Sequence, residues 1–154
     1  MNLDFKELLL AFNARNVEYL IVGAHALAAH GHVRATKDLD IWVRPEKSNA
    51  QQVLQALSDF GAPLSDLTVE DLSRKQTIFQ IGLPPLRVDV ITNIDGVEFV
   101  DAWPDRLEIL LAGVPAFVIS RHHLITNKTS SGRLQDLADV EQLEASTNFN
   151  QGSN

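Results

Sequence analysis

Residues 19–43 constrain the fold of this chain more than any other segment. They contain a short β-like run, a glycine, a helix-forming stretch of small residues and a second β-like run that opens with Asp38 and Asp40. Successive side chains of a strand point to opposite faces, so these two carboxylates share one face, with Trp42 beside them. Because two carboxylates on one face repel each other, they need a cation or a shared proton to offset the repulsion. The segment therefore predicts a strand that carries chemistry as well as structure.

The composition limits the classes of protein to which the chain can belong. Its 154 residues suit one domain with a hydrophobic core, which we expect at residues 1–145, followed by a disordered polar tail at 146–154. The formal net charge of -7 argues against a broad basic surface that coats nucleic acid. The absence of cysteine excludes disulfides and thiolate zinc sites. No apolar run approaches the length of a membrane span, so a cytoplasmic protein is expected.

Hydrophobic periodicity and turn residues predict a mixture of helices and strands. Helices are predicted at residues 4–14, 24–30, 48–60, 122–128 and 134–143, with one further helical turn at 69–72. Strands are predicted at residues 18–22, 38–43, 76–83, 86–91, 107–111 and 116–119. The segment 99–106 is predicted to be irregular. The pattern indicates neither an internal repeat nor a second domain.

Asp89 adds a third carboxylate to the pair formed by Asp38 and Asp40. It lies in the strand predicted at residues 86–91 and falls on the face opposite the aliphatic residues of that strand. If the two strands are neighbours in one sheet, three carboxylates converge. Oxygen ligands of this kind suit Mg²⁺ or Mn²⁺, and two such ions can activate a nucleophile and stabilise a leaving pyrophosphate. The alternative interpretation is a solvated strand face with unrelated acids.

Gly23 separates the first predicted strand from the helix predicted at residues 24–30. A glycine lets the backbone approach a ligand closely, and the N–H groups that begin a helix attract phosphate. The turn is therefore a candidate phosphate site. A plain connection between a strand and a helix would have the same sequence, so the turn alone does not decide between the two interpretations.

Four short patterns together resemble the nucleotidyltransferase superfamily of the DNA polymerase β type. They are VGAH at residues 22–25, HG at 30–31, RATKDLDI at 34–41 and RVDV at 87–90. More narrowly, the chain is similar to the small prokaryotic branch that includes the minimal nucleotidyltransferases and the AbiEii-like toxins. The runs LITNK at residues 124–128 and GRLQDLADV at 132–140 also resemble that branch. The resemblance spans residues 19–143.

The resemblance implies an α/β (α+β) fold of the nucleotidyltransferase type, with a mixed sheet packed by helices on one side. It also implies that Asp38, Asp40 and Asp89 are the catalytic residues. The first two would hold two Mg²⁺ ions, or Mn²⁺, and the third would bind one ion and help to deprotonate the attacking hydroxyl. The matching nucleotide-binding positions are Gly23, Ala24, His25, Arg34, Thr36, Lys37 and Lys128. Ala24 and His25 depart from the Gly-Gly or Gly-Ser pattern that is usual at this turn.

For several of these side chains the sequence leaves a structural role open. Arg34 and Lys37 could contact a phosphate or an acidic acceptor, or they could pair with the acids that follow them. Lys128 could lie near the nucleotide or form an ion pair with the next helix. Trp42 could stack on a base or pack in the core. The last predicted helix begins with a set of charged residues that we interpret as structural ion pairs: Arg133, Asp136 and Asp139.

These features together predict Mg²⁺-dependent transfer of a nucleoside monophosphate from an NTP to a hydroxyl acceptor. The acceptor is an RNA 3′ end, a protein side chain or a small molecule, and the sequence leaves all three open. The alternative is a catalytically weak binding protein with the same fold that acts with a protein partner, as in a toxin–antitoxin pair. The departure at Ala24 and His25 favours that alternative. A metal-dependent phosphohydrolase that uses the same acids ranks third.

Overall fold

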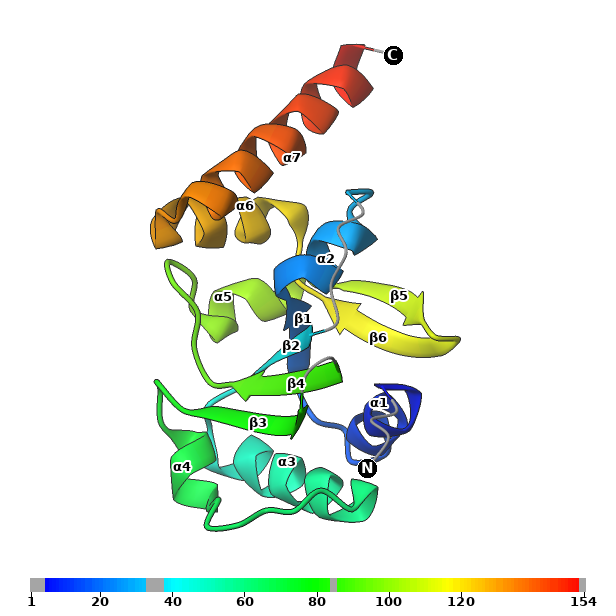
Figure 1. Ribbon diagram of the computed structural model, residues 1–154, viewed down its shortest axis with the longest axis vertical. Helices are drawn as coiled ribbons and strands as arrows, with labels where there is room; N and C mark the ends of the chain where they lie inside the picture. Colours follow the sequence, from blue (N-terminus) through cyan, green and yellow to red (C-terminus); the bar gives the residue numbers. More distant parts are fainter. Residues whose placement is uncertain (1–4, 33–37, 84–85, 153–154) are drawn as a thin grey trace.

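The computed structural model describes residues 5–32, 38–83 and 86–152, which form one six-stranded sheet with helices around it (Figure 1). The strands are β1 (Tyr19–Val22), β2 (Asp38–Val43), β3 (Ile78–Leu83), β4 (Leu86–Ile91), β5 (Leu107–Leu111) and β6 (Val114–Val118). The helices are α1 (Phe5–Ala14), α2 (Gly23–Ala29), α3 (Lys47–Phe60), α4 (Val69–Ser73), α5 (Phe99–Ala102), the 3-10 helix η1 (Trp103–Asp105), α6 (Arg121–Ser131) and α7 (Leu134–Gly152). The predicted α/β fold with a mixed sheet is confirmed.

The order of the strands in the sheet is β3-β4-β2-β1-β6-β5, so β3 and β5 form its edges. β2 pairs in parallel with β4 and β1 pairs in parallel with β6, whereas the remaining neighbours are antiparallel. In the β2–β4 pair, Asp40 is the register partner of Asp89. The sheet therefore places two of the three predicted catalytic carboxylates side by side, although they lie far apart in the sequence.

Helices α1 and α3 pack against each other on one side of the sheet (Figure 1). Leu8, Leu9 and Phe12 of α1 are fully buried, which is the apolar stripe expected of a helix with one face on the core. Helix α3 ends at Gly61, whose φ of 91° lies in the left-handed region that commonly terminates helices. These two helices form the predicted layer of helices on one side of the sheet.

The opposite face is covered at one end by α5 and η1. The indole of Trp42, only 1% exposed, lies 5.0 Å from the ring of Phe99, which stacks on Trp103 at 5.6 Å. The prediction of irregular structure at residues 99–106 is wrong, because these aromatic contacts stabilise short helices that propensity alone would not form. Trp42 therefore packs in the core. The Asp40 end of β2 is left facing a cavity.

The chain ends in two helices, and α7 projects away from the body of the molecule (Figure 1). Ser120 caps α6, because its hydroxyl accepts the backbone N–H of His123. Helix α7 continues to Gly152, whereas the sequence predicted a helix end at residue 143 and a disordered tail at 146–154. Once a helix has nucleated, each further residue adds a hydrogen bond at low cost, so a polar segment can extend it.

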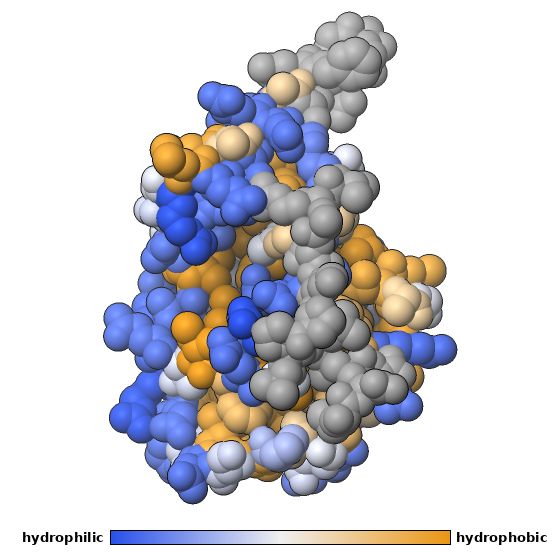
Figure 2. All heavy atoms as spheres, viewed as in Figure 1, coloured by the Kyte–Doolittle hydropathy of each residue, from blue (hydrophilic) through white to orange (hydrophobic). Residues whose placement is uncertain are grey.

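The surface carries both polar and apolar areas (Figure 2). Apolar side chains gather over the β5–β6 hairpin, where Leu107 is 42% exposed and Leu110 is 71% exposed. No helix within the described ranges combines the length and the apolar character needed to cross a membrane. Leu110 lies on β5, the edge strand at the far side of the sheet from β3.

Candidate functional site

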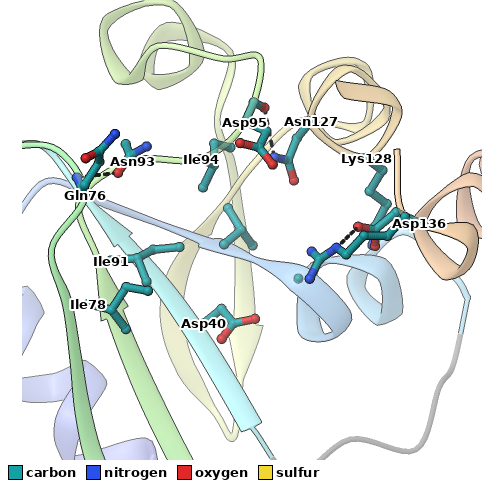
Figure 3. A pocket seen from close by; sticks show the side chains of 13 residues that line it. Asp40, Gln76, Ile78, Ile91, Asn93, Ile94, Asp95, Asn127, Lys128 and Asp136 are labelled. Atoms are coloured by element: carbon teal, nitrogen blue, oxygen red, sulfur yellow. Dashed lines mark hydrogen bonds and ion pairs between the residues drawn. The ribbon is translucent and has the colours of Figure 1, made fainter. Parts of the chain in front are cut away.

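A cavity of about 450 Å³ opens beside Asp40 (Figure 3). The β1–α2 junction, β3, β4, the turn after β4 and the facing ends of α6 and α7 supply its lining. Gly23, Asp40 and Lys128 line it, so three residues that the resemblance selected from distant parts of the chain meet in one place. Figure 3 shows Ile78 and Ile91 on one side of Asp40. Lys128 lies on the other side.

Arg87 lies between the carboxylates of Asp38 and Asp89. Its Nε is 3.0 Å from Oδ1 of Asp89. Its Nη2 is 3.2 Å from Oδ2 of Asp89 and 3.3 Å from Oδ2 of Asp38. The hydrogen bond to Asp89, followed by the charges of the acids, raises the pKa of Arg87 above its ordinary value. One guanidinium therefore offsets the repulsion between two of the three acids.

Asp40 has no ion pair with any residue in the described part of the chain. Burial raises the pKa of its carboxyl to about 6, and the charges of Asp89 and Asp38 act in the same direction. Arg87 and Lys128 oppose this rise only in part. The ionised form of Asp40 is therefore disfavoured in the metal-free protein, and a bound cation would relieve that destabilisation.

The chemistry of the three acids fits a hard divalent cation, because carboxylate oxygens are the ligands that Mg²⁺ and Mn²⁺ prefer. Among residues 5–32, 38–83 and 86–152, no group of three or more histidine, aspartate or glutamate side chains is already arranged around a common point where a metal could bind. Asp38 and Asp89 instead direct oxygens at Arg87. A metal ion that uses all three acids therefore has to displace at least one contact of Arg87.

Gly23 packs directly against Asp40 at the β1–α2 junction. Its φ is 70°, and a Cβ added there would lie less than 3.0 Å from Oδ2 of Asp40. Glycine is the residue that combines this left-handed backbone with enough room for the carboxylate. The glycine of the predicted phosphate turn therefore also shapes the position of a predicted metal ligand.

Replacing Gly23 with alanine is expected to lower the free energy of unfolding by about 2–4 kcal/mol, because a strained φ is combined with overpacking against Asp40. Gly113→Ala is the matched control, since Gly113 has a φ of 80° but open space around the added Cβ. We expect the control to lose only about 1 kcal/mol. Urea denaturation of both variants measures the difference. Equal losses would show that the Asp40 side chain moves aside freely.

His25 faces helix α1 instead of the cavity. Its ring meets the ring of Phe5 edge to face, with 5.8 Å between the centroids. Burial lowers the pKa of His25, although the charge of Asp38 opposes the shift, and its Nε2 is buried without a hydrogen-bond partner among the described residues. Ala24 does not line the cavity either. The remaining predicted nucleotide contacts lie outside the described residues: Arg34, Thr36 and Lys37.

Lys128 is buried where α6 meets α7, with 5% of its surface exposed. Its Nζ is 2.8 Å from Oδ2 of Asp139 and 3.2 Å from Oδ1 of Asp136. Asp136 also pairs with Arg133 at 2.9 Å. Burial alone would raise the pKa of Asp136, but the hydroxyl of Ser131 and the two cations lower it below its ordinary value. The predicted set of structural ion pairs is confirmed, and Lys128 is its central cation.

The opposite wall of the cavity was not singled out by the sequence. Ile78 on β3 and Ile91 on β4 are register partners and both line the cavity, with Asn93 on the same side (Figure 3). Alternation along the strand predicted at residues 86–91 places Ile91 on the same face as Asp89, and this was the sequence signal that could have identified Ile91. The register between β3 and β4 has no comparable local signature, so Ile78 could not be identified from the sequence.

Comparisons with known proteins agree with this fold. A model of the family described as "Nucleotidyltransferase of unknown function (DUF6036)" matches residues 1–151. The lincosamide antibiotic adenylyltransferase LnuA, solved with lincomycin bound, is similar to the chain with a TM-score of 0.56 and 18% identity, covering 94% of this chain and 98% of that chain. ANT(2″)-Ia, solved in complex with adenylyl-2″-tobramycin, is similar with a TM-score of 0.59 and 16% identity, covering 92% and 86%.

A curated relative is also similar in sequence. It is described as an ATP phosphoribosyltransferase from Salinispora tropica, and it is 28% identical over 144 residues. The match covers 92% of this chain but only 47% of the relative. The chain therefore spans about half the length of that protein.

Proposed function

The chain belongs to the family of nucleotidyltransferases whose model spans residues 1–151, and we propose that it transfers a nucleoside monophosphate from an NTP to a hydroxyl acceptor with the help of Mg²⁺. One observation carries this proposal. The register pairing of β2 with β4 sets Asp40 beside Asp89, next to a cavity that also holds Gly23 and Lys128. The proposed setting is the cytoplasm.

The proposed metal ligands are Asp38, Asp40 and Asp89. When bound, Mg²⁺ or Mn²⁺ would neutralise charge on the phosphates and make the acceptor hydroxyl easier to deprotonate. The destabilised charge on Asp40 supports this assignment, because the protein itself supplies no ion pair for it among the described residues. Arg87 supports it as well, since a guanidinium already occupies the position where the acids need positive charge.

The protein's own groups would position the substrates. Gly23 and Lys128 lie on the side of the cavity that suits the triphosphate, because a glycine permits close backbone approach and a lysine offsets phosphate charge. Asp89 would take the proton of the acceptor hydroxyl. The acceptor oxygen then forms a bond to the α-phosphorus, the bond to the β-phosphate breaks, and pyrophosphate leaves. Further nucleotide contacts are proposed at Arg34, Thr36 and Lys37, which lie outside the described residues.

Label transfer tests this proposal. The purified protein is incubated with Mg²⁺ and each α-labelled NTP in the presence of RNA, protein and low-mass fractions of a cell lysate. We expect one fraction to gain label, and we expect Asp89→Asn to lower the rate by at least about 100-fold, because a positioned general base contributes that much or more. Calorimetry should show that the wild-type protein binds Mg·NTP.

A charge-matched variant controls for non-specific effects of removing an acid. Asp66→Asn changes an exposed aspartate outside the cavity, and it should transfer label at the wild-type rate. A wild-type protein that neither binds Mg·NTP nor labels any fraction would refute the proposal. If Asp89→Asn transfers label at the wild-type rate, the proposed nucleotidyl transfer stands but the mechanism that uses three acids is refuted.

The second candidate is a binding protein with weak or no transferase activity that works in a complex, such as a toxin–antitoxin pair. The position of His25 favours it, because the side chain that replaces the usual small residue packs on Phe5 instead of lining the cavity. This candidate predicts that Mg·NTP binds without transfer to any fraction. It also predicts that a protein partner co-purifies with the chain in stoichiometric amount.

A further inference from the structure

The wall of the cavity opposite Lys128 forms an apolar ledge, which consists of Ile78, Ile91 and Ile94. Ile78 and Ile91 are register partners on β3 and β4, and Ile91 shares the face of its strand with Asp89. Ile78 is 66% exposed, although it stands on an edge strand beside the acids. An exposed apolar surface next to a polar site is typical of a place where a ligand binds.

Two carboxamides line the same cavity as this isoleucine ledge: Asn93 on the ledge side and Asn127 on α6 beside Lys128 (Figure 3). Oδ1 of Asn93 accepts the backbone N–H of Gln76 at 2.5 Å, which directs the amide toward this backbone and leaves its NH₂ as a donor. Nδ2 of Asn127 donates to the carbonyl of Asp95 at 2.9 Å, which leaves its Oδ1 as an acceptor. The cavity therefore offers amide donors and an amide acceptor beside an apolar wall, a combination that suits a molecule with hydroxyl groups and an apolar face.

The charges on the two sides of the cavity differ. On the ledge side, the carboxylate of Asp95 is the one charged side chain that lines the described wall. The lining cations, Lys128 and Arg133, lie on the α6–α7 side, where both pair with Asp136. A polyanion such as RNA requires cations along its backbone, and this wall provides none among the described residues. The ledge therefore suits a neutral or positively charged molecule.

The geometry of in-line transfer determines which side of the cavity holds the acceptor and which side holds the leaving pyrophosphate. The attacking hydroxyl and the leaving pyrophosphate lie on opposite sides of the α-phosphorus. Lys128 lies on one side of Asp40, and Ile78 and Ile91 of the isoleucine ledge lie on the other (Figure 3). If the pyrophosphate leaves on the side of the lysine, then the acceptor must enter over the ledge.

We propose that the isoleucine ledge is the acceptor subsite and that the acceptor is a small hydroxyl compound with an apolar face, neutral or cationic. This inference rests on the proposed nucleotidyl transfer. The hydroxyl oxygen of the acceptor forms the new bond to the α-phosphorus, its proton passes to a carboxylate of the acid cluster, and the electrons of the broken bond leave with pyrophosphate. An acceptor of this class takes the place of the RNA 3′ end and the protein side chain that the sequence left open.

The label-transfer assay tests the proposal when the acceptor fractions are kept separate. We expect label in the low-mass fraction, and we expect Ile78→Asp to lower kcat/KM for that acceptor by about tenfold or more without changing the calorimetric Kd for Mg·NTP. Leu110→Asp is the matched control, because Leu110 is similarly exposed (71% against 66% for Ile78) on the other edge strand, and it should change neither quantity. Label in RNA or protein would overturn the proposal. An equal loss of Mg·NTP affinity in Ile78→Asp would overturn it too, because the ledge would then hold the nucleobase.

A second measurement needs no turnover. The δ1-methyl NMR signal of Ile78 should shift when lincomycin or tobramycin is added, and it should stay in place when Mg²⁺ and a non-hydrolysable NTP analogue are added. A shift with the analogue, or no shift with either small hydroxyl probe, contradicts the acceptor subsite. If the analogue does not bind at all and no fraction is labelled, the proposed function itself fails. If the analogue binds and only RNA or protein is labelled, the acceptor proposal alone fails.

Discussion

Asp40→Asn is expected to lower nucleotidyl transfer by about 1,000-fold, because it removes a proposed metal ligand whose charge acts on the transition state. The same substitution should stabilise the metal-free protein at pH 8. The folded-state pKa of Asp40, about 6, lies above the ordinary value of 3.8. The carboxyl therefore contributes stability below the ordinary pKa, and this contribution is lost as the pH rises through about 6. After allowance for solvent screening, the gain in Asp40→Asn is on the order of 1–2 kcal/mol at pH 8.

Thermal unfolding in EDTA, from pH 4 to pH 8, measures this effect. The melting temperature of the wild type should fall relative to that of Asp40→Asn as the pH rises through the pKa of Asp40. Adding Mg²⁺ should then stabilise the wild type and leave the variant nearly unchanged, because only the wild type has the complete set of acids. Asp66→Asn should behave as the wild type does in every arm. Equal stabilisation of both proteins by Mg²⁺ would show that Asp40 is not a ligand.

Lys128→Met is expected to lower the free energy of unfolding by about 3 kcal/mol, because it removes the buried cation that contacts both Asp136 and Asp139. For a domain of this size the melting temperature should fall by roughly 6–12 °C. Adding Asp139→Asn to Lys128→Met should recover part of the lost stability, since the carboxylate charge of Asp139, which Lys128 no longer neutralises, is then removed as well. Such recovery separates a charge effect from a loss of packing.

Lys75→Met is the control for Lys128→Met. Lys75 also pairs with a carboxylate, Glu98, at 2.7 Å, but both side chains are more than half exposed. Exposed pairs contribute little, so the loss should stay within about 0.5 kcal/mol. Chemical denaturation measures the loss of stability in Lys75→Met, in Lys128→Met and in Lys128→Met combined with Asp139→Asn. Similar losses for both lysines would show that the α6–α7 junction opens to solvent more readily than its burial indicates.

The sequence predicted the parts of the site that depend on local patterns. Alternation along one strand predicts that Asp38 and Asp40 share a face, and the register of β2 with β4 confirms that Asp89 joins them. The family resemblance added Gly23 and Lys128, which both line the cavity. These residues could be predicted because their positions follow from the period of a strand or from a motif of fixed spacing.

The parts that were missed depend on pairing between distant segments. The contacts of Arg87 with two acids require the register of β2 against β4, and the exposure of Ile78 requires that β3 be an edge strand. The short helices after Glu98 form because Phe99 and Trp103 stack near Trp42, and propensity carries no information about such a stack. Arg34, Thr36 and Lys37 lie outside the described residues, so their roles stay predictions.

The position of Arg87 on the same strand face as Asp89, two residues earlier, has a consequence for folding. Asp89 and its counterion Arg87 both belong to β4, so this strand can pair with β2 as a nearly neutral unit. Arg87 therefore offsets part of the repulsion between the carboxylates as the sheet assembles, which lowers the electrostatic barrier to this long-range pairing step. A nascent chain that ends before Arg87 has neither the third acid nor the guanidinium, so it cannot form the proposed metal site.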